Sequence, residues 1–154
     1  MKLRLRNDFA MSVADAYAML TDPEFARAVA AASKPLSYDV RADGLSLRVR
    51  RTMAADSVVR ALTGPTVTIL DEITWDPPSG VEHTGSARVR VEKLPGELSA
   101  RLRLHAGGRG ALLDYDGELQ VAVPVVGAAI ERKAAPILRQ AITLQQSVAD
   151  TWAG

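Results

Sequence analysis

Residues 97–121 read ELSARLRLHAGGRGALLDYDGELQV, and their pattern is the strongest structural signal in the chain. Apolar and polar side chains alternate on both sides of a glycine-rich centre, Gly107-Gly108-Arg109-Gly110. A period of two is typical of a strand with one covered face and one face in water, and glycine permits a tight turn. The pattern therefore predicts two antiparallel strands, over residues 97–105 and 112–123, joined by a hairpin.

The same alternation recurs upstream of this hairpin. It predicts four further strands over residues 36–42, 45–52, 66–75 and 81–92, with turn residues between them. Residues 54–65 have the composition of one or two helical turns that end at Gly64-Pro65. Because no long helical pattern separates the strands, we expect them to form an antiparallel sheet.

The chain opens with one more alternating segment, residues 2–9, and two short helical patterns follow it. Ser12 and Asp15 have the spacing of a capping box at the start of the first helix. Asp22 is suited to cap the second helix, with Pro23 at its first position. We expect this second helix to run to about Ala32.

The last long segment has the period of a helix. An advance of about 100° per residue from Ile130 predicts an apolar stripe about 120° wide. The stripe contains Ile130, Ala134, Ile137, Leu138, Ala141, Leu144, Val148 and Trp152. Arg139 and Gln146 lie on the opposite side, so we expect the stripe to cover one face of the sheet.

The composition restricts the classes of partner. A chain of 154 residues suits a single domain over residues 1–154, and 19 Lys plus Arg against 18 Asp plus Glu give a formal net charge of +1. We therefore expect no nucleic-acid partner and no long-range attraction to an acidic membrane surface. Cysteine is absent and no apolar run is long enough to span a membrane, so we expect a cytoplasmic protein without integral membrane association.

The order of elements resembles the START-like superfamily, also called the SRPBCC, helix-grip or polyketide-cyclase-like fold. Residues 14–25, ADAYAMLTDPEF, resemble its opening helix pair, in which a D-P-x-hydrophobic motif restarts the helix. Three features resemble, more narrowly, a bacterial branch known only as a domain of unknown function: residues 58–64, residues 74–77, and residues 123–127 before a helix that bears Glu131. The resemblance implies an α+β fold of order β-α-α-β6-α, in which a curved antiparallel sheet of about seven strands wraps a long C-terminal helix.

Small residues in the inward phase, such as Gly85, Ala87, Ala100 and Gly117, predict space between the sheet and this helix. Such sites are usually apolar with a few polar groups. We expect a lipid-like or polyketide-like small molecule there, with residues 54–65 as a mobile gate. The expected ligand contacts are Leu47, Val49, Arg51, Val59, Leu62, Ile69, Asp71, Ile73, His83, Val89, Leu102, Tyr115, Ile137, Leu138 and Ala141. A solid core without a ligand is the simpler alternative for the aliphatic members.

Two other functions stay open. In an enzyme of the cyclase, hydratase or hydrolase type, His83 or Asp71 would be the general base, with Arg51 or Tyr115 orienting a substrate oxygen. A co-chaperone-like protein interaction is the third possibility. Two histidines without clustered carboxylates make a poor metal site, and no motif calls for a cofactor. His105 shares the outward phase of Arg101 and Arg103 and is expected at the surface.

Overall fold

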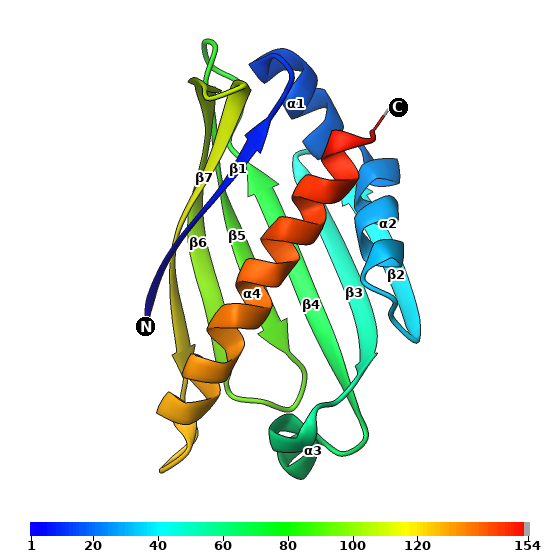
Figure 1. Ribbon diagram of the computed structural model, residues 1–154, viewed down its shortest axis with the longest axis vertical. Helices are drawn as coiled ribbons and strands as arrows, with labels where there is room; N and C mark the ends of the chain where they lie inside the picture. Colours follow the sequence, from blue (N-terminus) through cyan, green and yellow to red (C-terminus); the bar gives the residue numbers. More distant parts are fainter. Residues whose placement is uncertain (153–154) are drawn as a thin grey trace.

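The computed structural model describes residues 1–152, with the side chain of Val58 excepted. Its elements follow the predicted order (Figure 1). The strands are β1 (Lys2–Phe9), β2 (Ser37–Asp43), β3 (Ser46–Ala54), β4 (Thr66–Trp75), β5 (His83–Val91), β6 (Gly96–Gly107) and β7 (Gly110–Val121). The helices are α1 (Val13–Leu20), α2 (Pro23–Ala32), α3 (Ser57–Thr63) and α4 (Gly127–Asp150).

The strands form one antiparallel, 7-stranded sheet in the order β1-β7-β6-β5-β4-β3-β2. From β2 to β7 each strand pairs with the next in sequence, and β1 adds to the edge beside β7. The predicted hairpin is present, since pairing of β6 with β7 continues to Gly107 and Gly110. The α+β helix-grip architecture predicted from the sequence is confirmed.

Helix α4 crosses one face of the sheet diagonally (Figure 1), and we call this face the inner face. The contacts of α4 with the sheet concentrate on β1 and β7. There Leu3, Leu98 and Leu119 form a buried cluster, against which Ala134, Ala135 and Leu138 of α4 pack. A second, larger cluster contains Phe9, Leu102, Leu104 and Leu113. Burial is therefore deepest on the side of the sheet that α4 covers.

The two short helices begin where their capping residues predict. The Ser12 side chain accepts a hydrogen bond from the Asp15 backbone amide at 3.1 Å. Asp22 accepts from the Glu24 amide at 2.9 Å, and Pro23 occupies the start of α2. Helix α2 brings Phe25 into edge contact with Trp152, with ring centroids 5.3 Å apart. This contact holds the C-terminal end of α4 beside α2.

The predicted inward stripe of α4 is partly wrong. Ile130 and Ala149 are buried, but Ile137 is 51% exposed. Ala141 is also exposed, whereas Gln146, predicted on the outer side, bonds to the backbone of β1. The face of α4 that packs on β1 therefore includes polar side chains, and the predicted apolar stripe lies to one side of it.

Candidate functional site

The inner face is covered unevenly. Inner side chains of β6 and β7 such as Leu102 and Leu113 are buried, whereas those in the middle of β3, β4 and β5 are only half-buried. Val67 and Trp75, at the two ends of β4, are buried. The register aligns Leu47, Ile73 and Ala87 with the buried Ala100 in one row across four strands. We define the inner patch as the half-buried inner side chains Leu47, Val49, Arg51, Ile69, Asp71, Ile73, Ala87 and Val89. It remains accessible because α4 lies nearer the β1–β7 edge.

Helix α4 presents an apolar border to the inner patch. Ile137, Ala141 and Leu144 lie on the stripe that ends at Trp152, the residue that contacts Phe25 of α2. Since α2 packs over β2 and β3, this stripe is turned toward the β2–β4 side of the inner face. Ile137 and Ala141, expected as ligand contacts, are therefore available, and Leu138 is partly buried against the Leu98 cluster.

One ion pair lies within the inner patch. An Nη2 atom of Arg51 is 3.1 Å from Oδ2 of Asp71, and the two side chains are only 18% and 26% exposed. Burial raises the pKa of the Asp71 carboxyl, while the charge and hydrogen bond of Arg51 act in the opposite direction. The guanidinium carries five N–H donors, of which this bond uses one. The pair is thus a polar centre among aliphatic side chains.

Tyr115 belongs to a structural network and is not free to bind a ligand as expected. Its hydroxyl donates to Oδ1 of Asn7 at 3.0 Å and accepts from Nε2 of Gln145 at 2.9 Å. Asn7 is 1% exposed and donates to the Ile142 carbonyl of α4 at 3.0 Å. Burial raises the pKa of the Tyr115 hydroxyl well above its usual range. The network fastens α4 to β1 and β7.

The residues of this network other than Tyr115 were missed by the sequence reasoning. Asn7 shares the phase of Leu3, Leu5 and Phe9, so an unpaired polar side chain among inward apolar ones was the available signal. A buried amide needs partners, and the missing partners had to come from a covering element. Gln145 falls inside the predicted stripe of the helix and offered the same kind of signal, whereas Gln146 lies on the side predicted to face outward.

His83 lies on the inner face but far from Asp71. Its ring stacks on Tyr17 of α1, with ring centroids 3.6 Å apart and planes inclined by 11°. Asp71 pairs with Val89, which is six residues along β5 from His83, a separation of about 20 Å. The expectation that both side chains serve one catalytic site is therefore wrong. Burial lowers the pKa of the His83 imidazole, and its Nδ1 atom is buried without a hydrogen-bond partner.

Three further expected contacts lie outside the inner patch. Leu102 is 2% exposed and belongs to the core cluster. Val59 and Leu62 lie on α3, which contacts β4 at the end of the sheet (Figure 1). Leu62 is 43% exposed. A gating role for residues 54–65 stays a prediction.

His105, expected at the surface, is 14% exposed and lies 2.7 Å from Asp114.

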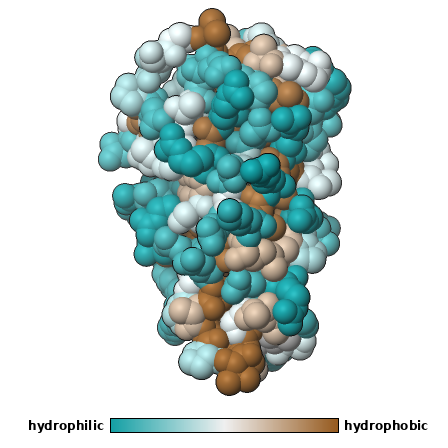
Figure 2. Space-filling view, turned by 90° about the vertical axis from the view of Figure 1, so that its left-hand side faces the viewer, coloured by the Kyte–Doolittle hydropathy of each residue, from teal (hydrophilic) through white to brown (hydrophobic). Residues whose placement is uncertain are grey.

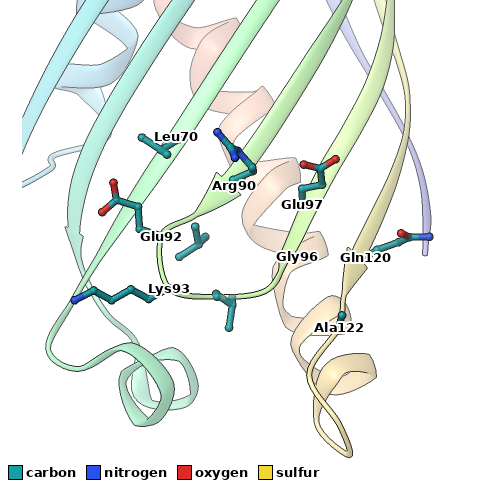
Figure 3. Close-up of a pocket in the computed structure, with 10 residues that line it drawn as sticks. Leu70, Arg90, Glu92, Lys93, Gly96, Glu97, Gln120 and Ala122 are labelled. Atoms are coloured by element: carbon teal, nitrogen blue, oxygen red, sulfur yellow. The ribbon is translucent and has the colours of Figure 1, made fainter.

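A hollow of about 500 Å³ opens on the other side of the sheet (Figure 3). Its walls include Leu70, Arg90, Glu97 and Gln120, which form one row across β4, β5, β6 and β7. In Figure 3 these side chains point away from α4, which lies behind the sheet. The lining mixes apolar side chains such as Val91 and Leu94 with the charged side chains of Arg90, Glu92 and Glu97. This hollow is not the predicted space between sheet and helix.

Among residues 1–152, no group of three or more His, Asp or Glu side chains is arranged to hold a metal ion. No helix within this range combines the length and apolar character needed to cross a bilayer.

Solved structures share this fold. The protein TTHA0849 from Thermus thermophilus is 14% identical with a TM-score of 0.64, over 97% of this chain and 94% of that one. A START superfamily protein from Mycobacterium smegmatis is 12% identical with a TM-score of 0.56, over 96% and 94%. A STAR-related lipid transfer protein from Xanthomonas axonopodis is 11% identical with a TM-score of 0.56, over 97% and 81%. At these identities the likeness establishes the START-like fold alone.

The sequence comparisons give a family. No curated protein matches the chain. A family profile described as "Protein of unknown function (DUF2505)" matches residues 4–153, which confirms the predicted resemblance to a branch of unknown function. The chain therefore belongs to the DUF2505 family and has a START-like fold.

Proposed function

We propose that this protein binds an apolar or amphipathic small molecule between the inner patch and the exposed stripe of α4. The observation that carries the proposal is the accessible apolar surface on both borders of this space. Ile69, Ile73 and Val89 are half-buried on the sheet, and Ile137 is 51% exposed on the helix. Exposed apolar surface that a ligand covers supplies about 25 cal/mol of binding free energy per Å².

The Arg51–Asp71 pair supports a ligand with one polar group. A side-chain pair that is only 18% and 26% exposed is poorly hydrated, so a ligand oxygen replaces little bound water when it contacts the guanidinium. Arg51 faces Ile69 across the β3–β4 pair, so the polar centre adjoins aliphatic side chains. The arrangement fits a molecule with an apolar body and a carboxylate, sulfonate or carbonyl group.

One comparison and one distance within this chain favour binding as the class of activity. One protein of the same fold is described as a STAR-related lipid transfer protein. The catalytic alternative loses its paired residues, because His83 and Asp71 lie about 20 Å apart. We therefore favour carriage or binding of a ligand over its chemical conversion.

A matched pair of substitutions on β4 tests the site. Ile69 and Leu70 are consecutive, both half-buried, and point to opposite faces of the sheet. We expect anilinonaphthalene sulfonate to bind the wild-type protein saturably, Ile69→Trp to weaken binding about tenfold by filling the inner space, and Leu70→Trp to leave it unchanged. Equal affinity of the two variants, with both folded by circular dichroism, would contradict the site.

The polar group is tested with the same probe. Replacement of both partners, Arg51→Met with Asp71→Leu, leaves no unpaired buried charge and is expected to fold. We expect this variant to bind the anionic sulfonate about tenfold more weakly and neutral Nile red with unchanged affinity. Loss of both probes alike would show that the pair has a structural role only.

A further inference from the structure

The end of the molecule opposite α1 carries two joined loops. The β5–β6 turn, residues 92–95, and the β7–α4 loop, residues 122–126, leave the sheet side by side because Gly96 pairs with Val121. The Ala122 amide donates to the Pro95 carbonyl at 2.9 Å. We call these two loops the tip. Figure 1 shows them beyond the ends of β6 and β7, at the end of the sheet where α3 also lies.

The tip displays apolar side chains in a fixed geometry. Val125 is 102% exposed and Val126 is 40% exposed. Val125 lies at the centre of a γ-turn, in which the Val126 amide donates to the Pro124 carbonyl at 2.8 Å. Its φ of 71° is strained for a β-branched residue. Figure 2, which faces the β1–β7 edge, shows hydrophobic atoms gathered at this lower end.

The backbone on both sides of Val125 is held in place. The Gly127 amide donates to the Val123 carbonyl at 2.8 Å, and the Ile130 amide to the Val126 carbonyl at 3.0 Å. A Cβ at Gly127 would lie 2.4 Å from the Val121 carbonyl oxygen, so glycine permits this close approach of α4 to β7. The valines are thus presented by a hydrogen-bonded turn anchored to the sheet.

The charges around the tip are unbalanced. Lys93, Arg132 and Lys133 are exposed, and none of them forms an ion pair with another described residue. The neighbouring acids are neutralised: Glu92 lies 3.1 Å from Arg50, Glu97 lies 2.8 Å from Arg88, and Glu131 lies 3.2 Å from the N-terminal amine. Farther along β7, exposed Glu118 lies opposite exposed Lys2 in the β1–β7 register, so these two charges offset each other. The apolar point therefore has an excess of positive charge around it.

We propose that the tip docks on the surface of an anionic lipid bilayer, with Val125 and Val126 at the boundary of headgroups and acyl chains and Lys93, Arg132 and Lys133 among the headgroups. The overall charge of +1 does not oppose this, because charges act at a membrane within a Debye length of about 10 Å. Apolar side chains flanked by basic ones are the combination that interfacial binding uses.

The proposal concerns a surface distinct from the inner patch, so the two can fail independently. Docking would place the end of the sheet that bears α3 against the membrane, where an apolar ligand could enter or leave. If the protein binds a soluble probe but does not bind vesicles, the docking proposal alone is refuted. Vesicle binding without probe binding would refute the ligand site alone.

The test is cosedimentation of the full chain with vesicles at low ionic strength. We expect binding to vesicles of phosphatidylcholine with about 30 mol% phosphatidylglycerol, and much weaker binding to phosphatidylcholine alone. Val125→Asp with Val126→Asp is expected to reduce the partition coefficient about tenfold or more. Arg132→Gln with Lys133→Gln is expected to reduce it about fivefold for each charge removed, and added salt should weaken wild-type binding.

Val81→Asp provides the matched control. Val81 is 83% exposed and lies between β4 and β5, at the opposite end of the sheet. This variant should bind vesicles like the wild type. Aspartate adopts a positive φ more readily than valine, so the tip variant is expected to fold with an unchanged melting temperature. Equal vesicle binding of the tip variant and of Val81→Asp would overturn the proposal. It would also be overturned if the wild-type protein is a dimer without vesicles and the tip variant is a monomer.

Discussion

At the scale of single residues, His83 is the polar side chain with the most unusual surroundings. It stacks on Tyr17 with ring centroids 3.6 Å apart, and its Nδ1 atom is buried without a partner. Burial lowers the pKa of the imidazole, which means that protonation favours the unfolded chain. The stability that neutral His83 contributes is fully present above the unfolded pKa of about 6.5 and is lost as pH falls through the lower folded value.

This sign can be measured directly. His83→Phe keeps a flat ring against Tyr17 and removes the titrating group. Between about pH 7.5 and pH 5, we expect the free energy of urea unfolding to fall more in the wild-type protein than in His83→Phe. Parallel loss in the two proteins would show that protonation of His83 does not couple to folding.

The sequence predicted on which face of the sheet each side chain lies, but it did not predict which side chains meet across neighbouring strands. Alternation correctly placed Arg51, Asp71 and His83 on the inner face. Which of them meet depends on the register between strands, and turns of several residues leave the register open. Register brings Asp71 close to Arg51 of β3 and pairs His83 with Leu104 of β6, where its ring stacks on Tyr17 of α1. The two candidate catalytic side chains are therefore far apart.

At the scale of elements, the position of α4 depends on the polar network around Asn7. Three bonds connect Asn7, Tyr115 and Gln145, and Gln146 bonds both the amide and the carbonyl of Asp8. Buried amides and hydroxyls need such partners. The hydrogen bonds of this network turn Gln145 and Gln146 toward β1, so the apolar stripe of α4 that contains Ile137 lies to one side. A wheel drawn from the sequence places Gln146 outward, although this side chain bonds to β1, so hydropathy alone could not place the helix face correctly.

We expect Tyr115→Phe to lower the free energy of unfolding by about 1–2 kcal/mol and Asn7→Ala by about 3 kcal/mol, since the latter leaves several buried groups unpaired. The double variant should lose less than the sum of the two, because both act on one network. Thr143→Ala, which removes only a bond to the Arg139 carbonyl within α4, is the control and should change stability by less than about 0.5 kcal/mol. Additive effects would show that the bonds act independently.

At the scale of the whole molecule, the fold was predictable because several signals agree. Alternation, turn residues, helix caps and the order of elements all indicate one sheet with one long covering helix, and this is what the structure has. How much of the inner face the helix leaves uncovered was not predictable. That quantity depends on the displacement of α4 toward β1 and β7, which arises from contacts between residues more than 100 positions apart.

The central claim is that the uncovered part of the inner face holds a small molecule. Native mass spectrometry of the protein purified from its own organism, before and after organic extraction, tests this most directly. The account predicts one small-molecule adduct per chain that extraction removes, that persists in Leu70→Trp and whose occupancy is lower in Ile69→Trp. The bare mass of the polypeptide before and after extraction, or equal occupancy of the adduct in Ile69→Trp and Leu70→Trp, would contradict the account.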